Sequence, residues 1–193
     1  MQLILASASP RRLALLRQIG LEPEVYVADV DETPRPGESP AALVRRLARA
    51  KAQAPGPPGP DTLILGADTV VDLDGQVLGK PVDREEGIAM LLALGGREHR
   101  VLTGLCLHRT LGRHGPVATR ALHVATRVRF GRVDAAAAAR YWDGGEPMGK
   151  AGGYAIQGHG ARFVAGIVGS YSNVVGLPLH ESARLLAAAG LKP

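Results

Sequence analysis

The sequence predicts a mixed α/β fold, because segments typical of strands and of helices follow one another along its 193 residues. Residues 2–6 are typical of a short buried strand, and they run directly into Ser9-Pro10, a pair that favours the start of a helix. Residues 63–71 form an apolar run typical of a strand covered on both faces. Residues 122–130 alternate in polarity, which indicates a strand with one exposed face.

Length and composition indicate a globular protein. The chain is long enough for one sizeable domain, or for two small lobes around one cleft. Hydrophobic residues make up 46% and charged residues 21%, and no apolar run reaches the roughly 20 residues that a membrane span needs. The N-terminus lacks the features of a secretory signal, so we expect a cytoplasmic protein. The single cysteine, Cys106, cannot form an internal disulfide and is expected in the core.

Five helices are expected where a cap precedes an apolar stripe or a glycine follows it. The first begins after Ser9 and runs to Gly20, and the second begins after Ser39 and runs to about Lys51. The third begins after Asp83, which forms a capping box with Glu86, and runs to Gly95-Gly96. The fourth begins after Asp134 and runs to Trp142, and the fifth runs from Pro178 to Ala189. The expected core-facing stripes are Leu13, Leu16 and Ile19 in the first helix, Leu43, Leu47 and Ala50 in the second, and Ile88, Leu91 and Leu92 in the third.

One further strand is expected over residues 20–30 and another over residues 97–108, the latter with Val101, Thr103, Leu105 and Leu107 on one side. Asp74-Gly75 is typical of a hairpin turn because it supplies positive φ angles, and the returning strand would bring Lys80 back toward Asp68. Residues 54–60, rich in Pro and Gly, are expected to be an exposed connector. Residues 144–176 contain ten glycines and are expected to form functional loops.

Asp68 interrupts the apolar run of residues 63–71, where a carboxylate is poorly tolerated unless it is paired or functional. One explanation is a turn or cap at the end of the strand, because Asp bonds neighbouring amides readily. The other is a carboxylate held at a strand tip, where it binds a divalent cation or takes a proton from water. The local sequence leaves both open.

Arg11 and Arg12 fall in the first turn of the first expected helix, where the helix dipole disfavours cations. An anion there would reverse the effect, and the amides of the helix start with the Ser7 and Ser9 hydroxyls would form a phosphate cradle. Two solvated arginines are the alternative. Three nearby acids, Asp29, Asp31 and Glu32, could help to hold a metal ion or could belong to an exposed loop.

The formal charge of +5 suits an anionic partner, although it does not choose between nucleic acid, nucleotide and solubility alone. Aromatic residues make up only 4%, which argues against a surface that stacks single-stranded bases. Only four of the 23 basic residues are Lys, and Lys51, Lys80 and Lys150 lie in motif-like stretches. A compact ammonium suits phosphate oxygens crowded around a metal, whereas chance and solubility are the alternative.

Together, these cations and acids are what phosphoryl or nucleotidyl chemistry needs. The sequence has no Walker A motif, no Gly-rich dinucleotide fingerprint, no zinc-site spacing of Cys or His and no G-x-S-x-G motif. It therefore argues against a serine hydrolase or a zinc enzyme.

Several motifs in order resemble the Maf family of house-cleaning nucleoside triphosphate pyrophosphatases over nearly the whole chain. They are LASASPRR at 5–12, Asp31-Glu32, Arg46-Leu47-Ala48 with Lys51-Ala52, GADTVV at 66–71, Gly79-Lys80-Pro81, KAGGYAIQG at 150–158, and Gly169-Ser170-Tyr171 with NVVGLP at 173–178. The resemblance implies one Maf-like domain over residues 1–193, with an elongated mixed sheet, flanking helices and two lobes around a deep cleft. It also implies a protein that is often dimeric.

The resemblance further implies hydrolysis of a nucleoside triphosphate between the α and β phosphates with Mg²⁺ or Mn²⁺. By resemblance, Asp68 accepts the proton of the attacking water or holds the metal, and Glu32 assists at the metal. The residues that would grip the triphosphate are Ser9, Arg12, Lys51 and Lys80.

The family branch that acts on dTTP, UTP and modified uridine triphosphates resembles this chain at Arg11, Thr69 and Gln157, while the branch that acts on 7-methyl-GTP departs there. We therefore expect a house-cleaning dTTP/UTP pyrophosphatase without a stable nucleic-acid complex or a membrane partner. The rival interpretation is a regulator of septum formation that binds nucleotide or nucleic acid in the same pocket without hydrolysis.

Overall fold

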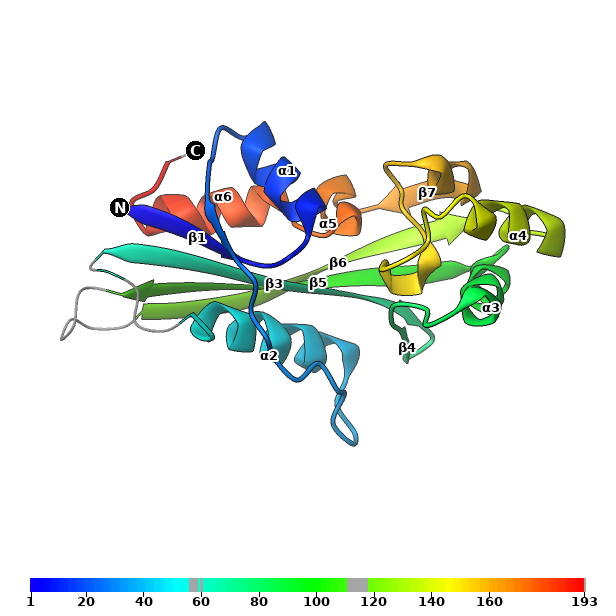
Figure 1. Ribbon diagram of the computed structural model, residues 1–193, viewed down its shortest axis with the longest axis horizontal. Helices are drawn as coiled ribbons and strands as arrows, with labels where there is room; N and C mark the ends of the chain where they lie inside the picture. Colours follow the sequence, from blue (N-terminus) through cyan, green and yellow to red (C-terminus); the bar gives the residue numbers. More distant parts are fainter. Residues whose placement is uncertain (56–58, 60, 111–117, 193) are drawn as a thin grey trace. The chain divides into compact units, whose positions relative to one another are not determined.

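The computed structural model describes residues 1–55, 59, 61–110 and 118–192. Much of the expected connector, at 56–58 and 60, lies outside the described residues. The described strands form one mixed sheet of seven strands in the order β2-β1-β3-β5-β6-β7, with β4 paired to β3 (Figure 1). The chain divides into two compact units, Met1–Asp68 with Thr103–Val124 and Gly176–Pro193, and Thr69–Leu102 with Ala125–Val175. The mixed α/β fold expected from the sequence is confirmed.

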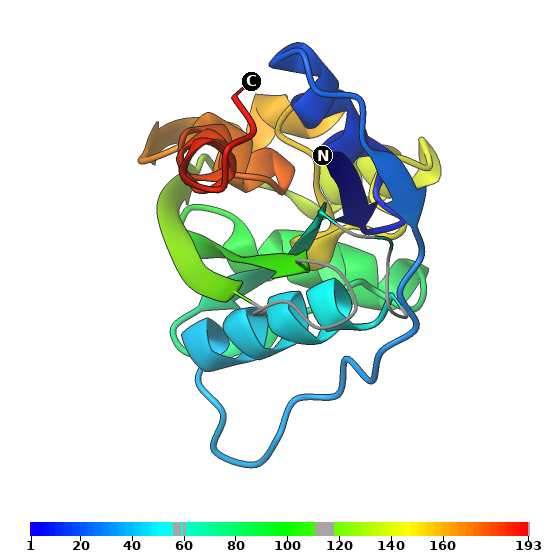
Figure 2. The same ribbon diagram turned by 90° about the vertical axis from the view of Figure 1, so that its left-hand side faces the viewer.

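The first unit has parallel pairing at its centre. Its elements are β1 (Gln2–Ala6), α1 (Pro10–Gln18), β2 (Glu24–Tyr26), α2 (Pro40–Gln53), α6 (Leu179–Ala188), and parts of β3 (Thr62–Leu73), β5 (Glu98–Thr110) and β6 (Ala118–Phe130). Strand β1 lies between β2 and β3 and pairs in parallel with both. Figures 1 and 2 show α2 on one face of these strands and α1 and α6 on the other.

Two glycines let α2 approach the sheet very closely. A Cβ on Gly66 of β3 would lie 2.3 Å from the Ala48 carbonyl oxygen, and one on Gly104 of β5 would lie 2.0 Å from that of Val44. Real Cβ atoms do not make such contacts, so any other residue would displace the helix. This close packing sets the distance between α2 and β3, the two elements that carry Lys51 and Asp68.

The second unit combines a hairpin, a second antiparallel pair and two packed helices. Its elements are the remaining parts of β3, β5 and β6 with β4 (Gln76–Leu78), α3 (Arg84–Leu94), α4 (Ala135–Asp143), the 3₁₀ turns Ala151–Gly153 and His159–Phe163, β7 (Val164–Val168) and α5 (Tyr171–Val175). Strand β4 pairs antiparallel with β3, and β7 pairs antiparallel with β6. Asp74 and Gly75 both have positive φ, as the expected hairpin requires.

Most helices and strands lie where the capping and turn residues of the sequence predicted them. Ser39, Asp83 and Asp134 each accept a hydrogen bond from the backbone N–H three residues later, which confirms these three helix starts. Cys106 is buried as expected. In the described residues, no helix combines the length and apolar character that crossing a membrane requires.

Four expectations about the elements are wrong. The strand expected within 20–30 is only Glu24–Tyr26. In α1, Leu15 is buried with Leu16, while Leu13 and Ile19 are only half-buried; in α3, Leu92 is 41% exposed. Residues 101–107 of β5 are buried on both faces rather than alternating. The region 144–176 also holds β7 and α5, so it is not made of loops alone.

Candidate functional site

The centre of the candidate site is a lysine that joins two carboxylates. Lys51, in the last turn of α2, donates from Nζ to Asp68 Oδ1 at 2.6 Å and to Glu32 Oε1 at 2.5 Å. The Lys51 and Asp68 side chains are each 10% exposed, whereas that of Glu32 is 46% exposed. All three residues belong to the first unit.

Asp68 lies inside the twelve-residue strand β3, followed by five more strand residues. A cap or turn at the end of the strand is therefore wrong, and so is the expectation of a strand tip. Its side chain is tolerated in the strand because Lys51 from α2 pairs with it. A lysine in the last turn of a helix can be there only because it complements the helix dipole. That reason alone does not explain why the Lys51 side chain is buried and bonded to two acids.

Arg12 is also buried in the first unit. Its Nε donates to the Gly176 carbonyl oxygen at 2.8 Å and its Nη1 donates to Ser7 Oγ at 2.9 Å. Burial lowers the pKa of the Arg12 guanidinium from its ordinary value, against the opposing attraction of Asp68 and Glu32. For Arg12, the alternative of a solvated arginine is therefore wrong.

The neighbours of Arg12 complete a cationic helix start. Arg11 is half-buried, and burial lowers the pKa of its guanidinium. Ser9 is the N-cap residue of α1 and Pro10 follows it, as expected, although among the described residues the Ser9 side chain forms no capping hydrogen bond. Its backbone N–H donates to Ser7 Oγ at 3.2 Å.

Of the three acids in the following loop, Glu32 is bonded to Lys51. Asp31 Oδ1 instead accepts the backbone N–H of Thr33 at 2.9 Å, a local turn, and hydrogen bonds from the side chain and the backbone of Thr33 lower the pKa of Asp31. Asp29 is exposed. Of these three acids, only Glu32 is therefore one of the two carboxylates bonded to Lys51.

The other three candidate residues, Thr69, Lys80 and Gln157, lie in the second unit. The β3–β4 register pairs Val71 with Leu78, the last residue of β4, and Lys80 follows two residues later. The expected hairpin is therefore present, and the approach of Lys80 to Asp68 stays a prediction.

Gln157 is exposed and follows a buried segment of the glycine-rich region. The Glu146 carboxylate holds this segment by accepting the backbone N–H groups of His159 at 2.8 Å and Gly160 at 2.9 Å and the Tyr141 hydroxyl at 2.7 Å. Glu146 was assigned no role from the sequence. A carboxylate inside a glycine-rich stretch was the available signal.

Within the described ranges, no three His, Cys, Asp or Glu side chains are placed to hold a metal ion together. Asp68 and Glu32 nevertheless face one small cation, the Lys51 ammonium. Mg²⁺ is commonly bound by one or two carboxylates completed by water and substrate phosphate oxygens. These two carboxylates therefore fit part of a site for a hard divalent cation.

Comparison with known proteins gives a consistent family. The family model described as Maf-like protein matches residues 2–189. The dTTP/UTP pyrophosphatase of Anaeromyxobacter sp. (strain Fw109-5) is 51% identical over 98% of this chain and 90% of its own length. Those of Pelotomaculum thermopropionicum and Symbiobacterium thermophilum are 48% and 50% identical over 98% of this chain and 97% and 94% of their own lengths. The chain therefore belongs to the Maf-like protein family.

Proposed function

We propose that this protein is a dTTP/UTP pyrophosphatase, a hydrolase that splits a nucleoside triphosphate into the monophosphate and pyrophosphate. The relatives at 48–51% identity carry that name. The structural observation that carries the proposal is the Lys51 ammonium bonded to Asp68 and Glu32 near buried Arg12. Cations for phosphate oxygens and a carboxylate for water are thereby combined in one unit.

The charges favour an anionic substrate. Arg11, Arg12 and Lys51 contribute three positive formal charges against the two negative formal charges of Asp68 and Glu32, so the group has a formal charge of +1. Burial of Arg12 and Lys51 strengthens their attraction for an anion, since the surroundings screen the charge less than water does. In this proposal these cations and the Ser9 hydroxyl bind the triphosphate.

Asp68 is proposed to take the proton of the attacking water on a carboxylate oxygen, or to hold the metal. A carboxylate ionised at neutral pH has the capacity for either role. A divalent cation, Mg²⁺ or Mn²⁺, held by Asp68 and Glu32 would neutralise charge on the phosphate oxygens. From the second unit, Lys80 is proposed to bind phosphate.

We further propose that Arg11, Thr69 and Gln157 select the pyrimidine base, and that modified pyrimidine triphosphates removed by house-cleaning are among the substrates. Residues 1–193 would act as one Maf-like domain in the cytoplasm, with a nucleoside triphosphate as partner. A homodimer is part of the proposal, and a stable complex with nucleic acid or membrane is not.

The test follows pyrophosphate release from dTTP, UTP, 7-methyl-GTP and ATP with Mg²⁺, and again with a chelator in excess. We expect release from dTTP and UTP that the chelator stops. No release from any of the four by a folded protein would refute the hydrolase and favour the non-hydrolytic regulator. Release from 7-methyl-GTP alone would refute the branch and leave the chemistry.

The variant Asp68→Asn keeps the size of the side chain but removes its charge and basicity. We expect turnover to fall by about 10²–10⁴-fold, the usual contribution of a positioned acid or base. Binding of dTTP, measured by calorimetry, should persist because Arg12 and Lys51 remain. A variant with near-normal turnover would show that Asp68 has neither proposed role.

A further inference from the structure

Arg46 of α2 ties down the loop that carries Glu32. Its Nε and Nη2 donate to the two carboxylate oxygens of Glu38 at 2.7 and 2.8 Å, a bidentate pair. Nη2 also donates to the carbonyl oxygen of Thr33, the residue after Glu32, at 3.0 Å. The side chains of Arg46 and Glu38 are 21% and 9% exposed. The guanidinium thus bonds the loop at both a side chain and the backbone.

Glu38 closes the loop from its own side. Its Oε2 accepts the backbone N–H of Arg35 at 3.1 Å, and its own N–H donates to the Arg35 carbonyl oxygen at 3.0 Å. The hydrogen bond from Arg46 lowers the pKa of the Glu38 carboxyl to about 2. Glu38 is therefore ionised throughout the neutral range, where it pairs with Arg46.

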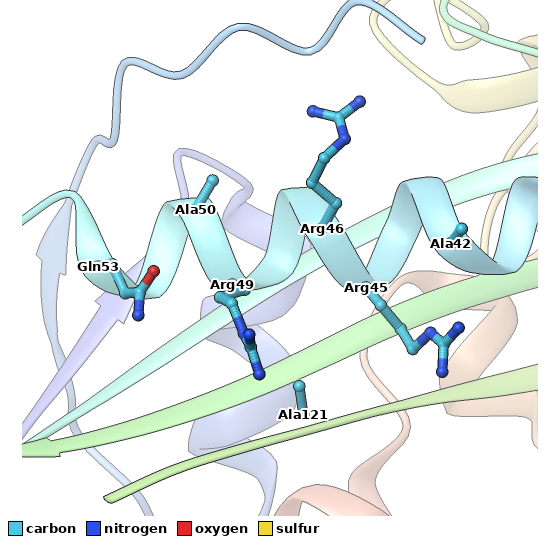
Figure 3. A pocket seen from close by; sticks show the side chains of 7 residues that line it. All are labelled: Ala42, Arg45, Arg46, Arg49, Ala50, Gln53 and Ala121. Atoms are coloured by element: carbon cyan, nitrogen blue, oxygen red, sulfur yellow. The ribbon is translucent and has the colours of Figure 1, made fainter. Parts of the chain in front are cut away.

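Arg46 points away from the other two arginines of α2, Arg45 and Arg49, and bonds the loop that carries Glu32. An open groove of about 510 Å³ lies beside the helix, lined by Ala42, Arg45, Arg46, Arg49, Ala50, Gln53 and Ala121. In Figure 3, Arg45 and Arg49 point toward the side of the helix where Ala121 lies, whereas Arg46 points to the opposite side. Arg45 donates from Nε to the Ala41 carbonyl oxygen of its own helix at 3.2 Å.

We infer that Arg46 and Glu38 are positioning residues that hold Glu32 against Lys51. Helix α2 grips the loop at two adjacent points, since Arg46 bonds Thr33 and Lys51 bonds Glu32. The Glu32 side chain is 46% exposed, and an ion pair that exposed contributes little order by itself. The partly buried, bidentate bond of Arg46 to Glu38 adds the order that the more exposed Glu32 carboxylate lacks in its pair with Lys51.

This inference rests on the proposed function, in which Glu32 assists at the metal. Residues that orient a metal ligand typically cost about 10–100-fold in metal affinity or activity when they are changed. Arg46→Lys keeps the charge but loses the fork, and Glu38→Gln loses the charge of its partner. We expect each to weaken Mn²⁺ binding to the substrate-free protein, and to lower kcat/KM for dTTP, by about 10–100-fold.

Two comparisons distinguish positioning from a general loss of structure. Hydrogen exchange read by mass spectrometry should rise within residues 31–38 in both variants, with the rest of α2 unchanged. In a Glu32→Gln background, Arg46→Lys should cause little further loss of kcat/KM, because its effect acts through Glu32. Arg49→Lys is the matched control, an exposed arginine of the same helix, and should match the wild type throughout.

Unchanged exchange at 31–38 in Arg46→Lys and Glu38→Gln would overturn the inference, as would an Arg46→Lys loss that is equally large without the Glu32 carboxylate. If the wild-type protein neither binds Mn²⁺ nor hydrolyses any triphosphate, the proposed function fails. The exchange measurement then decides alone whether Arg46 and Glu38 order the Glu32 loop.

Discussion

Replacing Lys51 by Met keeps an unbranched side chain but removes the ammonium that Asp68 and Glu32 share. Asp68 and Lys51 are each 10% exposed at the side chain and 2.6 Å apart, and breaking such a buried pair from one side costs about 3–5 kcal/mol. The bond to Glu32, 46% exposed, adds little. Arg12 stays near enough to attract Asp68, so we expect the lower end, about 3 kcal/mol. For a chain of this length that lowers Tm by roughly 6–12 °C.

The assay is urea unfolding at pH 7 followed by far-UV circular dichroism. Lys192→Met is the matched control because Lys192 is exposed. The double variant Lys51→Met/Asp68→Asn should be more stable than Lys51→Met, since it removes the uncompensated charge. A loss below about 1 kcal/mol, or additive effects of the two changes, would refute the reasoning.

Two further predictions concern the second unit. Lys80→Arg conserves charge but replaces a compact ammonium with a planar fork, so we expect kcat/KM for dTTP to fall by at least about 10-fold; unchanged kinetics would count against a phosphate contact. Burial lowers the pKa of His99 to about 4, below its unfolded value near 6.5, so the unfolded chain binds more protons between these values. The stability due to neutral His99 is therefore complete above about pH 6.5 and declines toward pH 4, by about 3 kcal/mol in total. Urea unfolding at pH 7.5 and 4.5 measures this loss, and His99→Gln should reduce it; an equal loss in the variant would contradict the assignment to His99.

The sequence could predict those elements that local chemistry decides. Ser39, Asp83 and Asp134 cap the helices that follow them, and Asp74-Gly75 makes the hairpin, because caps and tight turns depend on a few adjacent residues. The unusual position of Asp68 could also be recognised from the local sequence, since a carboxylate within an apolar run stands out before its partner is known.

Features set by tertiary contact could not be predicted in this way. Residues 101–107 of β5 were expected to alternate, but α2 covers one face so closely that Gly104 meets the Val44 carbonyl oxygen. Periodicity reports the polarity of side chains and not which helix covers them. The pair of Lys51 and Asp68 likewise depends on Gly66, whose role in admitting α2 has no local signature.

Arg46 and Glu38 were missed for a related reason. Glu38 lies beside Ser39-Pro40. Because Ser39-Pro40 alone is enough to predict the helix start, the Glu38 carboxylate was given no role. Arg46 lies in a family-like motif, yet a single arginine on a helix gives no sign of which acid it meets. The spacing of eight residues between them is not a helical repeat, because only Arg46 lies on the helix.

In this arginine-rich chain, Lys51 and Lys150 make different contacts, which give separate reasons for a lysine at each position. Lys150 donates to the carbonyl oxygens of Glu146 and Met148, so it stabilises a turn near the start of the glycine-rich region 144–176. Lys51 instead lies between carboxylates from two segments, with its single nitrogen within 2.6 Å of an oxygen of each. The planar fork of an arginine favours two parallel bonds to one carboxylate, as Arg46 makes with Glu38. A planar guanidinium at position 51 carries its donors on three separate nitrogens and does not reproduce a single nitrogen bonded to both acids, whereas the rotatable donors of one ammonium serve both.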